Sequence, residues 1–471
     1  MLFPSPVFLS IFLPTAVGLC AIFRAPRLRN ALLIVLSVAF YAWGGGWNAA
    51  LLIVSALFNW AISFGYLSAS RTRSRLTTAA AVAFNIGVLG WFKYAGFVVR
   101  GLNILLNVLL NVLLKGADPI AIPEPAAALP LGISFFTFQA LSYTLDVRAG
   151  RAEPCRNPLD LILYICLFPQ LIAGPILNWR DAAAQLKVNK MSWPSAAVGL
   201  RVFACGLAQK TLLADELAKL ANAAFDCPAD ARSAPLAWIG AVAYTLQIYL
   251  DFSGYSRMAI GLGKMLGFDF PENFRMPLAA RSMGDFWKRW HITLTKWFTQ
   301  YIYIPLGGNR GGRARTLRNV AVVFICTGIW HGAAWTFILW GLWNGLFVIL
   351  ERANWIRADR MPRPLAHIYV LMIVIIGFAL FRSSDLAKAG EYIVSMFDFH
   401  ALNYVRVSRL IEPLNIKAIA SLAIGILVSV PVAGVRNDAR GGWRKYAAGF
   451  ASAALIAWSY AAIIASGHHP F

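Results

Sequence analysis

Residues 244–255 read Tyr244-Thr-Leu-Gln-Ile-Tyr-Leu-Asp-Phe-Ser-Gly-Tyr255, and they open the stretch of sequence that decides how this chain folds. The stretch runs to residue 345 and contains two further motifs, Phe286-Trp-Lys-Arg-Trp-His-Ile-Thr-Leu-Thr295 and Gly328-Ile-Trp-His-Gly-Ala-Ala-Trp335. A carboxylate or an imidazole is costly to bury in such apolar surroundings unless it has a compensating role. Three such groups stand out here, Asp251, His291 and His331, and we interpret the rest of the chain as the scaffold that holds them.

The composition is that of an integral membrane protein. Of the 471 residues, 59% are hydrophobic and only 14% are charged, with a mean hydropathy of +0.61; soluble domains carry about 25% charged residues. Apolar stretches long enough to cross a bilayer recur from end to end, and no long polar segment separates them. We therefore predict a single polytopic, all-α membrane domain over residues 1–471, with about ten or eleven spanning or half-spanning helices. Its core is expected over residues 129–350 and its C-terminal helices over residues 366–466.

The charge balance is strongly basic, with 43 Lys and Arg against 21 Asp and Glu and a net charge of +22. In a soluble protein this balance would suggest nucleic acid, but here the basic residues lie mostly in short loops between apolar runs. The positive-inside rule assigns those loops to the cytoplasm and both chain termini to the outside. Some of the basic side chains could instead serve anionic lipid headgroups or an anionic ligand.

The cysteines and histidines predict no metal site. The six cysteines are scattered without a CxxC pair, so neither a zinc site nor a disulfide framework is indicated. A metal held by His291 and His331 lacks support from any carboxylate or Cys at ligand spacing. The first apolar run, residues 6–23, has no basic stretch before it and no clear cleavage site after it, so we expect a retained helix rather than a signal peptide.

Two stretches predict local structure that bears on the site. Residues 76–92 and 97–114 are expected to form two separate helices, the second with asparagines at steps of four along one face. Residues 281–300 mix Phe and Trp with Lys and Arg, which predicts one amphipathic helix lying at the membrane surface.

A polar stripe marks the first motif. Tyr244, Gln247, Asp251 and Tyr255 recur at helical spacing and would share one face of a helix. An ionisable group inside a membrane is a candidate for function. The alternative is a structural anchor that binds a neighbouring helix or an Arg.

The two histidines are the candidates for chemistry. His331 follows Trp330 and precedes a run of small residues that allow close approach by a helix or a substrate. Trp335 lies four residues on, so its ring can flank the imidazole. A neutral imidazole in an apolar site suits a general base, although a lone histidine on an apolar helix is more often a hydrogen-bonded core residue. His291 offers a second group to contact a ligand, while the basic and aromatic residues around it equally fit an interfacial anchor.

The glycine-rich segment Leu306-Gly-Gly-Asn-Arg-Gly-Gly-Arg313 brings backbone amides together with Arg310 and Arg313. Such a combination can cradle a phosphate. The segment lacks a Walker pattern, and the alternative is a flexible basic loop in the cytoplasm.

Seven motifs follow one another in a fixed order between about residues 30 and 350. They are Leu129-Pro-Leu-Gly-Ile-Ser-Phe-Phe-Thr-Phe-Gln, Phe168-Pro-Gln-Leu-Ile-Ala-Gly-Pro-Ile, Gln247-Ile-Tyr-Leu-Asp-Phe-Ser-Gly-Tyr-Ser, Phe270-Pro-Glu-Asn-Phe, Phe286-Trp-Lys-Arg-Trp-His-Ile-Thr-Leu, Tyr303-Ile-Pro-Leu-Gly-Gly-Asn-Arg and Thr327-Gly-Ile-Trp-His-Gly-Ala-Ala-Trp. With these motifs the chain resembles the membrane-bound O-acyltransferase (MBOAT) family, and in particular its bacterial alginate O-acetylase branch.

The resemblance implies a multihelical fold around a central funnel or tunnel in the bacterial inner membrane. It implies acetyl transfer from cytoplasmic acetyl-CoA to a hydroxyl on the far side. The acceptor would be an exported polysaccharide of the alginate, cellulose or peptidoglycan type, or a periplasmic partner protein that receives the acetyl group first. By resemblance, His331 matches the family's principal histidine in Trp-His-Gly, His291 matches the second histidine, and Asp215 matches an acidic residue that follows a Gly-Leu-x-x-Lys motif.

Three positions depart from the branch. Gln209 replaces a lysine, Arg257 replaces an aspartate after Gly-Tyr-Ser, and Asn344 replaces a frequent second histidine after the catalytic one. None of these changes touches His331.

We therefore expect an acetyltransferase in which His331 takes the proton of the acceptor hydroxyl, or alternatively carries the acetyl group transiently. His291 would position the donor or polarise its carbonyl, and Arg310 and Arg313 would meet the phosphates of acetyl-CoA. The rival interpretation is a transporter or flippase that moves its cargo without chemistry, and a third is a structural membrane subunit. The absence of a detectable internal repeat weighs against a transporter built from two similar halves.

Overall fold

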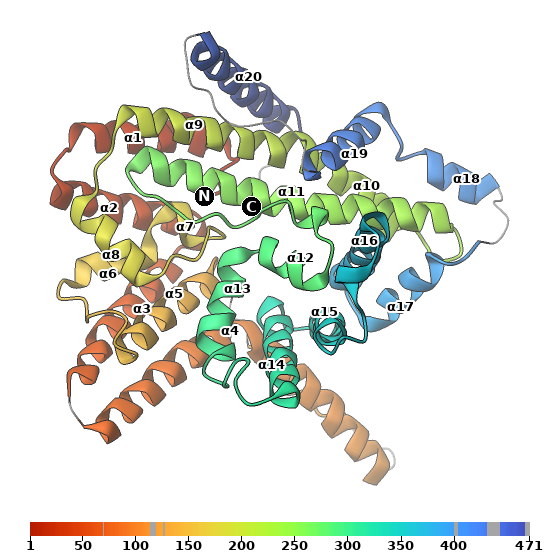
Figure 1. The fold of residues 1–471 in the computed structure, drawn as a ribbon, viewed down its shortest axis with the longest axis horizontal. Helices are drawn as coiled ribbons and strands as arrows, with labels where there is room; N and C mark the ends of the chain where they lie inside the picture. Colours follow the sequence, from red (N-terminus) through yellow and green to blue (C-terminus); the bar gives the residue numbers. More distant parts are fainter. Residues whose placement is uncertain (69, 114–118, 126–127, 400–403, 431–442, 467–471) are drawn as a thin grey trace.

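The computed structural model describes residues 1–471 apart from 69, 114–118, 126–127, 400–403, 431–442 and 467–471. Every regular element in the described residues is a helix, which confirms the all-α prediction (Figure 1). The N-terminal elements are η1 (Phe8–Phe12), α1 (Leu13–Ile22), α2 (Pro26–Gly45), α3 (Asn48–Ser63), η2 (Phe64–Leu67), α4 (Arg71–Leu113), α5 (Ile133–Arg148), α6 (Pro158–Cys166), α7 (Phe168–Leu171) and α8 (Trp179–Val188). The central elements are α9 (Trp193–Ala208), η3 (Gln209–Ala214), α10 (Asp215–Phe225), α11 (Ala234–Leu266), η4 (Pro277–Ala279), α12 (Met283–Arg289), α13 (Ile292–Phe298), η5 (Thr299–Tyr303), α14 (Arg313–His331) and α15 (Trp335–Arg352). The C-terminal elements are η6 (Ala358–Arg360), α16 (Arg363–Arg382), α17 (Leu386–Ser395), α18 (Tyr404–Ile411), α19 (Ile416–Ser429) and α20 (Trp443–Ser466).

The long helix α11 is the axis of the fold, and α9 lies along it (Figure 1). Glycines permit this close packing, because a Cβ on Gly206 would lie only 2.5 Å from the carbonyl oxygen of Gly254. A Cβ on Gly261 would likewise lie 2.5 Å from the carbonyl oxygen of Gly199. Small residues at such a crossing let two helix backbones approach closely inside a membrane, where van der Waals contact drives association.

Two hydrophobic clusters meet on α11. The C-terminal half of α11 packs with α1 to α3 and α5 to α9, and its N-terminal half packs with α10, α12, α14, α15 and α16. Asp251 lies on α11 between Leu250, in one cluster, and Met258, in the other. The polar stripe that the sequence predicts therefore lies where the two halves of the core join.

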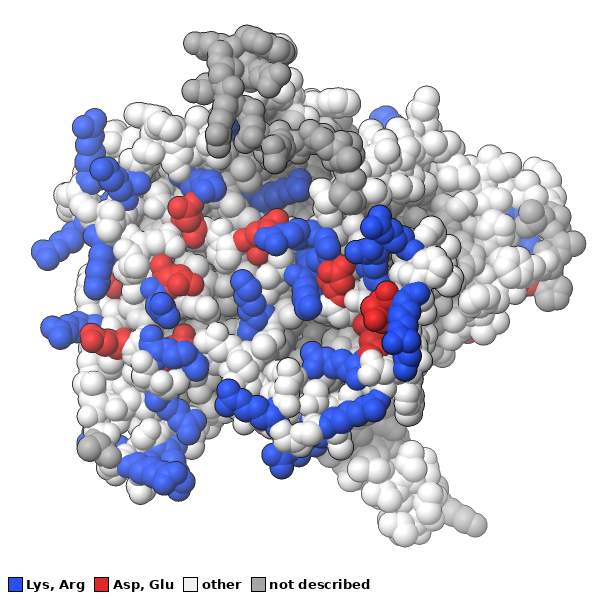
Figure 2. All heavy atoms as spheres, in the orientation of Figure 1, with Lys and Arg blue, Asp and Glu red and all other residues white. Residues whose placement is uncertain are grey.

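Within the described residues, six helical segments are long and apolar enough to cross a membrane, and the number is seven if the bent pair α18 and α19 counts as one span. The expected count of ten or eleven spanning or half-spanning helices is not confirmed by these numbers. Figure 2 shows one face of the molecule, on which Lys and Arg side chains are numerous and acidic side chains fewer.

Helix α4 corrects one prediction. The sequence suggested two helices over residues 76–92 and 97–114, but α4 continues unbroken from Arg71 to Leu113. No proline interrupts it, and its four glycines lower the helix propensity but keep their backbone N–H groups, so the backbone hydrogen bonds continue. The side chains of Asn103 and Asn107 instead pair with the backbone of Ile122 and Ile120, which lie alongside the helix.

The prediction of one amphipathic surface helix over residues 281–300 is also wrong. The segment contains two short helices, α12 and α13, which are separated at His291. The backbone of His291 has the left-handed values φ 42° and ψ 56°. Phe286 and Trp290 are only 2% and 4% exposed, so they anchor this segment in the protein core instead of in lipid headgroups. A left-handed backbone at a residue other than glycine is uncommon and is frequently found at functional sites.

Candidate active site

The two predicted histidines meet at Trp330. The centroid of the Trp330 indole lies 6.2 Å from the imidazole of His291 and 4.9 Å from that of His331. Phe135 of α5 closes against the same group, 5.8 Å from Trp330 and 6.4 Å from His291. The structure thus brings together side chains from α5, the α12–α13 turn and the end of α14 in one aromatic-lined site.

Asn273 fixes the tautomer of His291. The side-chain Oδ1 of Asn273 accepts a hydrogen bond from the backbone N–H of Thr293 at 3.2 Å, and it lies 3.1 Å from Nδ1 of His291. An atom that accepts from a backbone N–H is an oxygen, so Nδ1 of His291 must carry the proton. The other nitrogen, Nε2, is then the bare acceptor, and it is buried without a hydrogen-bond partner among the described residues.

His331 is the last residue of α14. Its imidazole packs edge-on against Trp340 at 4.8 Å and Phe381 at 5.3 Å. Its Nε2 is also buried without a hydrogen-bond partner within the described part of the chain. A buried polar atom without a partner is costly, and two of them facing one aromatic site indicate groups kept free for a ligand.

Trp335 does not flank His331 as the spacing suggested. Helix α14 ends at His331 and α15 begins at Trp335, so the two residues are not one turn apart on a continuous helix. The Trp335 side chain is 62% exposed and packs against Phe97 of α4 at 5.7 Å. The second tryptophan at the imidazole is Trp340, which the sequence did not single out.

Both imidazoles are held in the neutral form. They lie outside the six candidate membrane spans. Burial lowers the pKa of His291 to about 3. Burial also lowers the pKa of His331 well below its usual value, and the nearby His291 and Lys93 lower it further. A neutral imidazole with a free Nε2 has the lone pair that a general base requires.

The two predicted carboxylates belong to a neighbouring cluster. Lys210 of η3 bridges them, 2.6 Å from Asp215 and 2.8 Å from Asp251. This ion pair matches the anchor interpretation of Asp251. The cluster remains close to the histidines, because Phe252, the residue after Asp251, packs edge-on against His291 at 4.8 Å.

Gln209 and Arg257, two positions that depart from the expected pattern, bind each other. Nη1 of Arg257 donates to Oε1 of Gln209 at 2.9 Å, across the contact between η3 and α11. Asn344 donates to the carbonyl of Trp340, one turn earlier in α15, at 2.8 Å.

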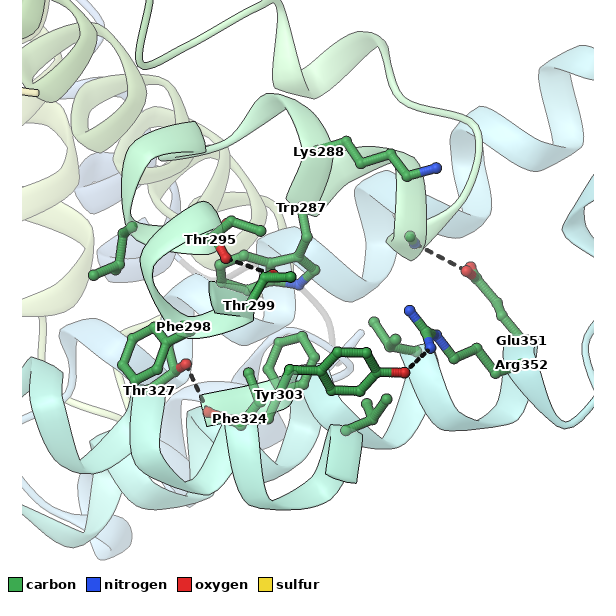
Figure 3. Close-up of a pocket in the computed structure, with 15 residues that line it drawn as sticks. Trp287, Lys288, Thr295, Phe298, Thr299, Tyr303, Phe324, Thr327, Glu351 and Arg352 are labelled. Atoms are coloured by element: carbon green, nitrogen blue, oxygen red, sulfur yellow. Dashed lines mark hydrogen bonds between the residues drawn. The ribbon is translucent and has the colours of Figure 1, made fainter. Parts of the chain in front are cut away.

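A cavity of about 350 Å³ lies between α12, α13, η5, α14 and α15 (Figure 3). The residues that line it are Gly284, Trp287, Lys288, Leu294, Thr295, Phe298, Thr299, Tyr303, Val320, Val323, Phe324, Thr327, Val348, Glu351 and Arg352. Thr327 precedes His331 by four residues on α14, and Leu294 follows His291 by three residues at the start of α13. Neighbours of both histidines in the chain therefore line the cavity, while the histidines themselves do not.

The cavity is apolar inside and charged at one end. Figure 3 shows Lys288, Glu351 and Arg352 on the side away from Phe298. Arg352 donates to the Tyr303 hydroxyl at 2.8 Å and to Asn309 at 3.3 Å, which ties the cavity to the glycine-rich loop. The indole Nε1 of Trp287 is buried and has no partner among the described residues, so it offers one hydrogen-bond donor.

Arg310 and Arg313 are both exposed on that glycine-rich loop. They border the charged end of the cavity through Asn309 but do not line it. The residues that do line it, Lys288 and Arg352, were missed because spacing along the chain does not reveal a cavity formed by separate helices. Asn273 was missed as a site residue for the same reason, although its motif was noted.

Comparison with known proteins identifies the class. A profile of MBOAT, the membrane-bound O-acyltransferase family, matches residues 34–381. The chain belongs to this family and is a multi-pass membrane acyltransferase.

Individual relatives extend the match over most of the chain. It is 40% identical over 407 residues to the probable alginate O-acetylase AlgI of Azotobacter vinelandii, covering 85% of this chain and 78% of the relative. It is 33% identical over 451 residues to the peptidoglycan O-acetyltransferase of Helicobacter pylori, covering 87% and 82%. It is 26% identical over 315 residues to the teichoic acid D-alanyltransferase of Bacillus subtilis, covering 62% and 78%.

Proposed function

We propose that this chain transfers an acetyl group from cytoplasmic acetyl-CoA to a hydroxyl of an exported polysaccharide, directly or through a periplasmic partner protein. The observation that carries the proposal is the pair of neutral histidines at Trp330, each with a buried Nε2 that has no partner among the described residues. The relatives named for O-acetylation of alginate and of peptidoglycan support both the acetyl group and the kind of acceptor.

His331 acts as the general base. Its Nε2 takes the proton of the acceptor hydroxyl while the hydroxyl oxygen attacks the carbonyl carbon of the thioester. The tetrahedral intermediate collapses, the carbon–sulfur bond breaks, and the imidazolium returns its proton to the departing thiolate of CoA. In the alternative, Nε2 itself attacks the carbonyl and holds the acetyl group until the hydroxyl takes it.

His291 positions a group that donates a hydrogen bond to its Nε2, and it does not polarise the thioester carbonyl. With its proton on Nδ1 and bound to Asn273, its Nε2 can accept a hydrogen bond but cannot donate one. It therefore suits an acceptor hydroxyl or an amide N–H of the pantetheine arm. This modifies the role that the sequence alone suggested for His291.

The cavity provides the path for the donor. Its apolar interior suits the pantetheine arm, and Lys288 and Arg352 suit the phosphates at its charged end. Arg310 and Arg313, exposed on the adjoining loop, extend this basic region. The positive-inside rule then assigns the charged end to the cytoplasm and, by the same count, both chain termini to the periplasm.

The test is acetyl-CoA turnover by the purified protein in lipid nanodiscs, supplied with an O-acetylatable polysaccharide and candidate periplasmic proteins. Release of CoA thiol is measured for the wild type, for His331→Ala, and for His367→Ala as a matched histidine control on α16. We expect the wild type and H367A to release CoA and H331A to lose the activity. Equal rates in H331A and the wild type would exclude His331 as the base, and uptake of a solute by intact vesicles without CoA release would favour the rival transporter.

A further inference from the structure

Helix α14 ends at the catalytic candidate, and its end is held by a different helix. The Tyr94 hydroxyl of α4 donates to the carbonyl of Ile329 at 2.5 Å, and Nζ of Lys93 donates to the carbonyl of Trp330. Lys93 also donates to Oγ of Ser134 at 3.2 Å, at the start of α5. The last carbonyls of a helix have no partner within it and need donors from outside. Side chains from α4 supply those donors immediately before His331.

Lys93 is an unusual residue for this task. It lies within α4, one of the candidate membrane spans, where an ammonium group is costly and is a candidate for function. No ion pair between Lys93 and a carboxylate occurs in the described parts of the chain. The negative end of the α14 dipole and the Trp330 ring, 5.5 Å away, offset only part of its charge. Tyr94 shows that a neutral hydroxyl can cap a carbonyl here, so capping alone does not require a cation.

The positive charge has a second effect on His331. The other side chains packed on this imidazole are Trp330, Trp340 of α15 and Phe381 of α16, all uncharged. The titratable groups that act on it are Lys93 and His291, and both lower its pKa in addition to the larger effect of burial. A cation nearby makes a second positive charge on the ring unfavourable.

We propose that Lys93 is the positioning residue of His331: its ammonium group, held by Ser134, binds the last carbonyl before His331 and so fixes the end of α14 and the place of the imidazole. The catalytic meaning of this role rests on the proposed function of His331 as a base. The capping of α14 by Lys93 does not depend on that function, because these contacts exist whatever reaction the site performs. Ser134, Tyr94 and the carbonyls of α14 hold the ammonium in place.

The test measures how firmly the His331 imidazole is held, without relying on turnover. Diethylpyrocarbonate acylates a neutral imidazole that it can reach, so the modification rate of His331 at pH 7, followed by peptide mass spectrometry, reports the accessibility of the ring. We expect a slow rate in the wild type. In Lys93→Met the rate should rise several-fold, because the end of α14 loses a donor to its last carbonyl. The hydrolysis of the reagent is corrected with free N-acetylhistidine.

Three variants separate this contact from general stability. Tyr94→Phe removes the cap bond to Ile329, one residue further from His331, so it should raise the modification rate less than Lys93→Met does, even if it lowers the melting temperature. Lys93→Arg should restore a slow rate, and Lys93→Gln replaces Lys93→Met if that variant does not fold. Equal rates in the wild type and in the uncharged variant would overturn the proposal, as would an equal rise in Tyr94→Phe. An absence of acetyl-CoA turnover in the wild type would instead reject the proposed function and leave the modification result to decide the role of Lys93.

Discussion

Replacing Asn273 by leucine tests how His291 is held. The side chain of Asn273 is buried, and its Oδ1 receives Nδ1 of His291, the backbone N–H of Thr293 and the Thr293 hydroxyl at 3.1, 3.2 and 2.9 Å. Leucine has a similar volume but accepts nothing, so the imidazole N–H, the backbone N–H and the Thr293 hydroxyl lose their acceptor. The hydroxyl can rotate, but the two N–H groups are fixed in direction. Each buried donor left unpaired costs about 1–3 kcal/mol, so the two N–H groups together predict a loss of roughly 2–6 kcal/mol in folding stability.

The assay combines thermal unfolding in detergent with CoA release. We expect Asn273→Leu to melt at a lower temperature and to turn over more slowly, because the proton of His291 is no longer confined to Nδ1. Asn273→Asp keeps the acceptor oxygen but attracts a second proton to the ring, so it should remain folded and lose activity. The exposed Asn111 provides the matched control, and Asn111→Leu should change neither property. The reasoning is refuted if Asn273→Leu melts and turns over as the wild type does.

Three further predictions concern the donor, the helix crossing and the pair of Gln209 and Arg257. Arg352→Glu should raise the KM for acetyl-CoA by about tenfold or more with a smaller change in kcat, since it reverses a charge where phosphates approach; an unchanged KM would remove Arg352 from the donor path. Gly206→Ala should lower the yield of monodisperse protein, because its Cβ meets α11 at 2.5 Å, whereas Gly87→Ala, which meets no atom within 4 Å, should not. Gln209→Lys should destabilise the protein by placing two cations together, and adding Arg257→Asp should recover the melting temperature, with a coupling of about 0.5–3 kcal/mol in a double-mutant cycle; simple additivity would contradict the pairing.

The sequence predicts the helical class and the two histidines because these follow from local chemistry. Long apolar runs with few charges can satisfy their backbone in a membrane only as helices here, and His291 and His331 stood out as ionisable groups in an apolar stretch. The continuity of α4 was missed because a few polar residues were taken as a boundary, although none of them interrupts backbone hydrogen bonding.

The remaining errors concern contacts between distant residues. The left-handed turn at His291 divides an amphipathic pattern that periodicity interprets as one helix. Trp335 was assigned to the imidazole by a helical spacing that ends at residue 331. Lys93 lies 237 residues before the carbonyl that it binds, so no local pattern could reveal this contact. Contacts between residues so far apart in the chain can be identified only once the packing of the helices is known.

The most direct test of the account is a cryo-electron microscopy structure with a non-cleavable analogue of acetyl-CoA in which a methylene replaces the thioester sulfur. The account predicts a pantetheine arm in the cavity, phosphates near Lys288 and Arg352, and the carbonyl carbon within about 6 Å of His331 Nε2, which leaves room for an acceptor hydroxyl between them. An analogue bound away from this cavity, or one whose carbonyl lies beyond reach of His331, would contradict it.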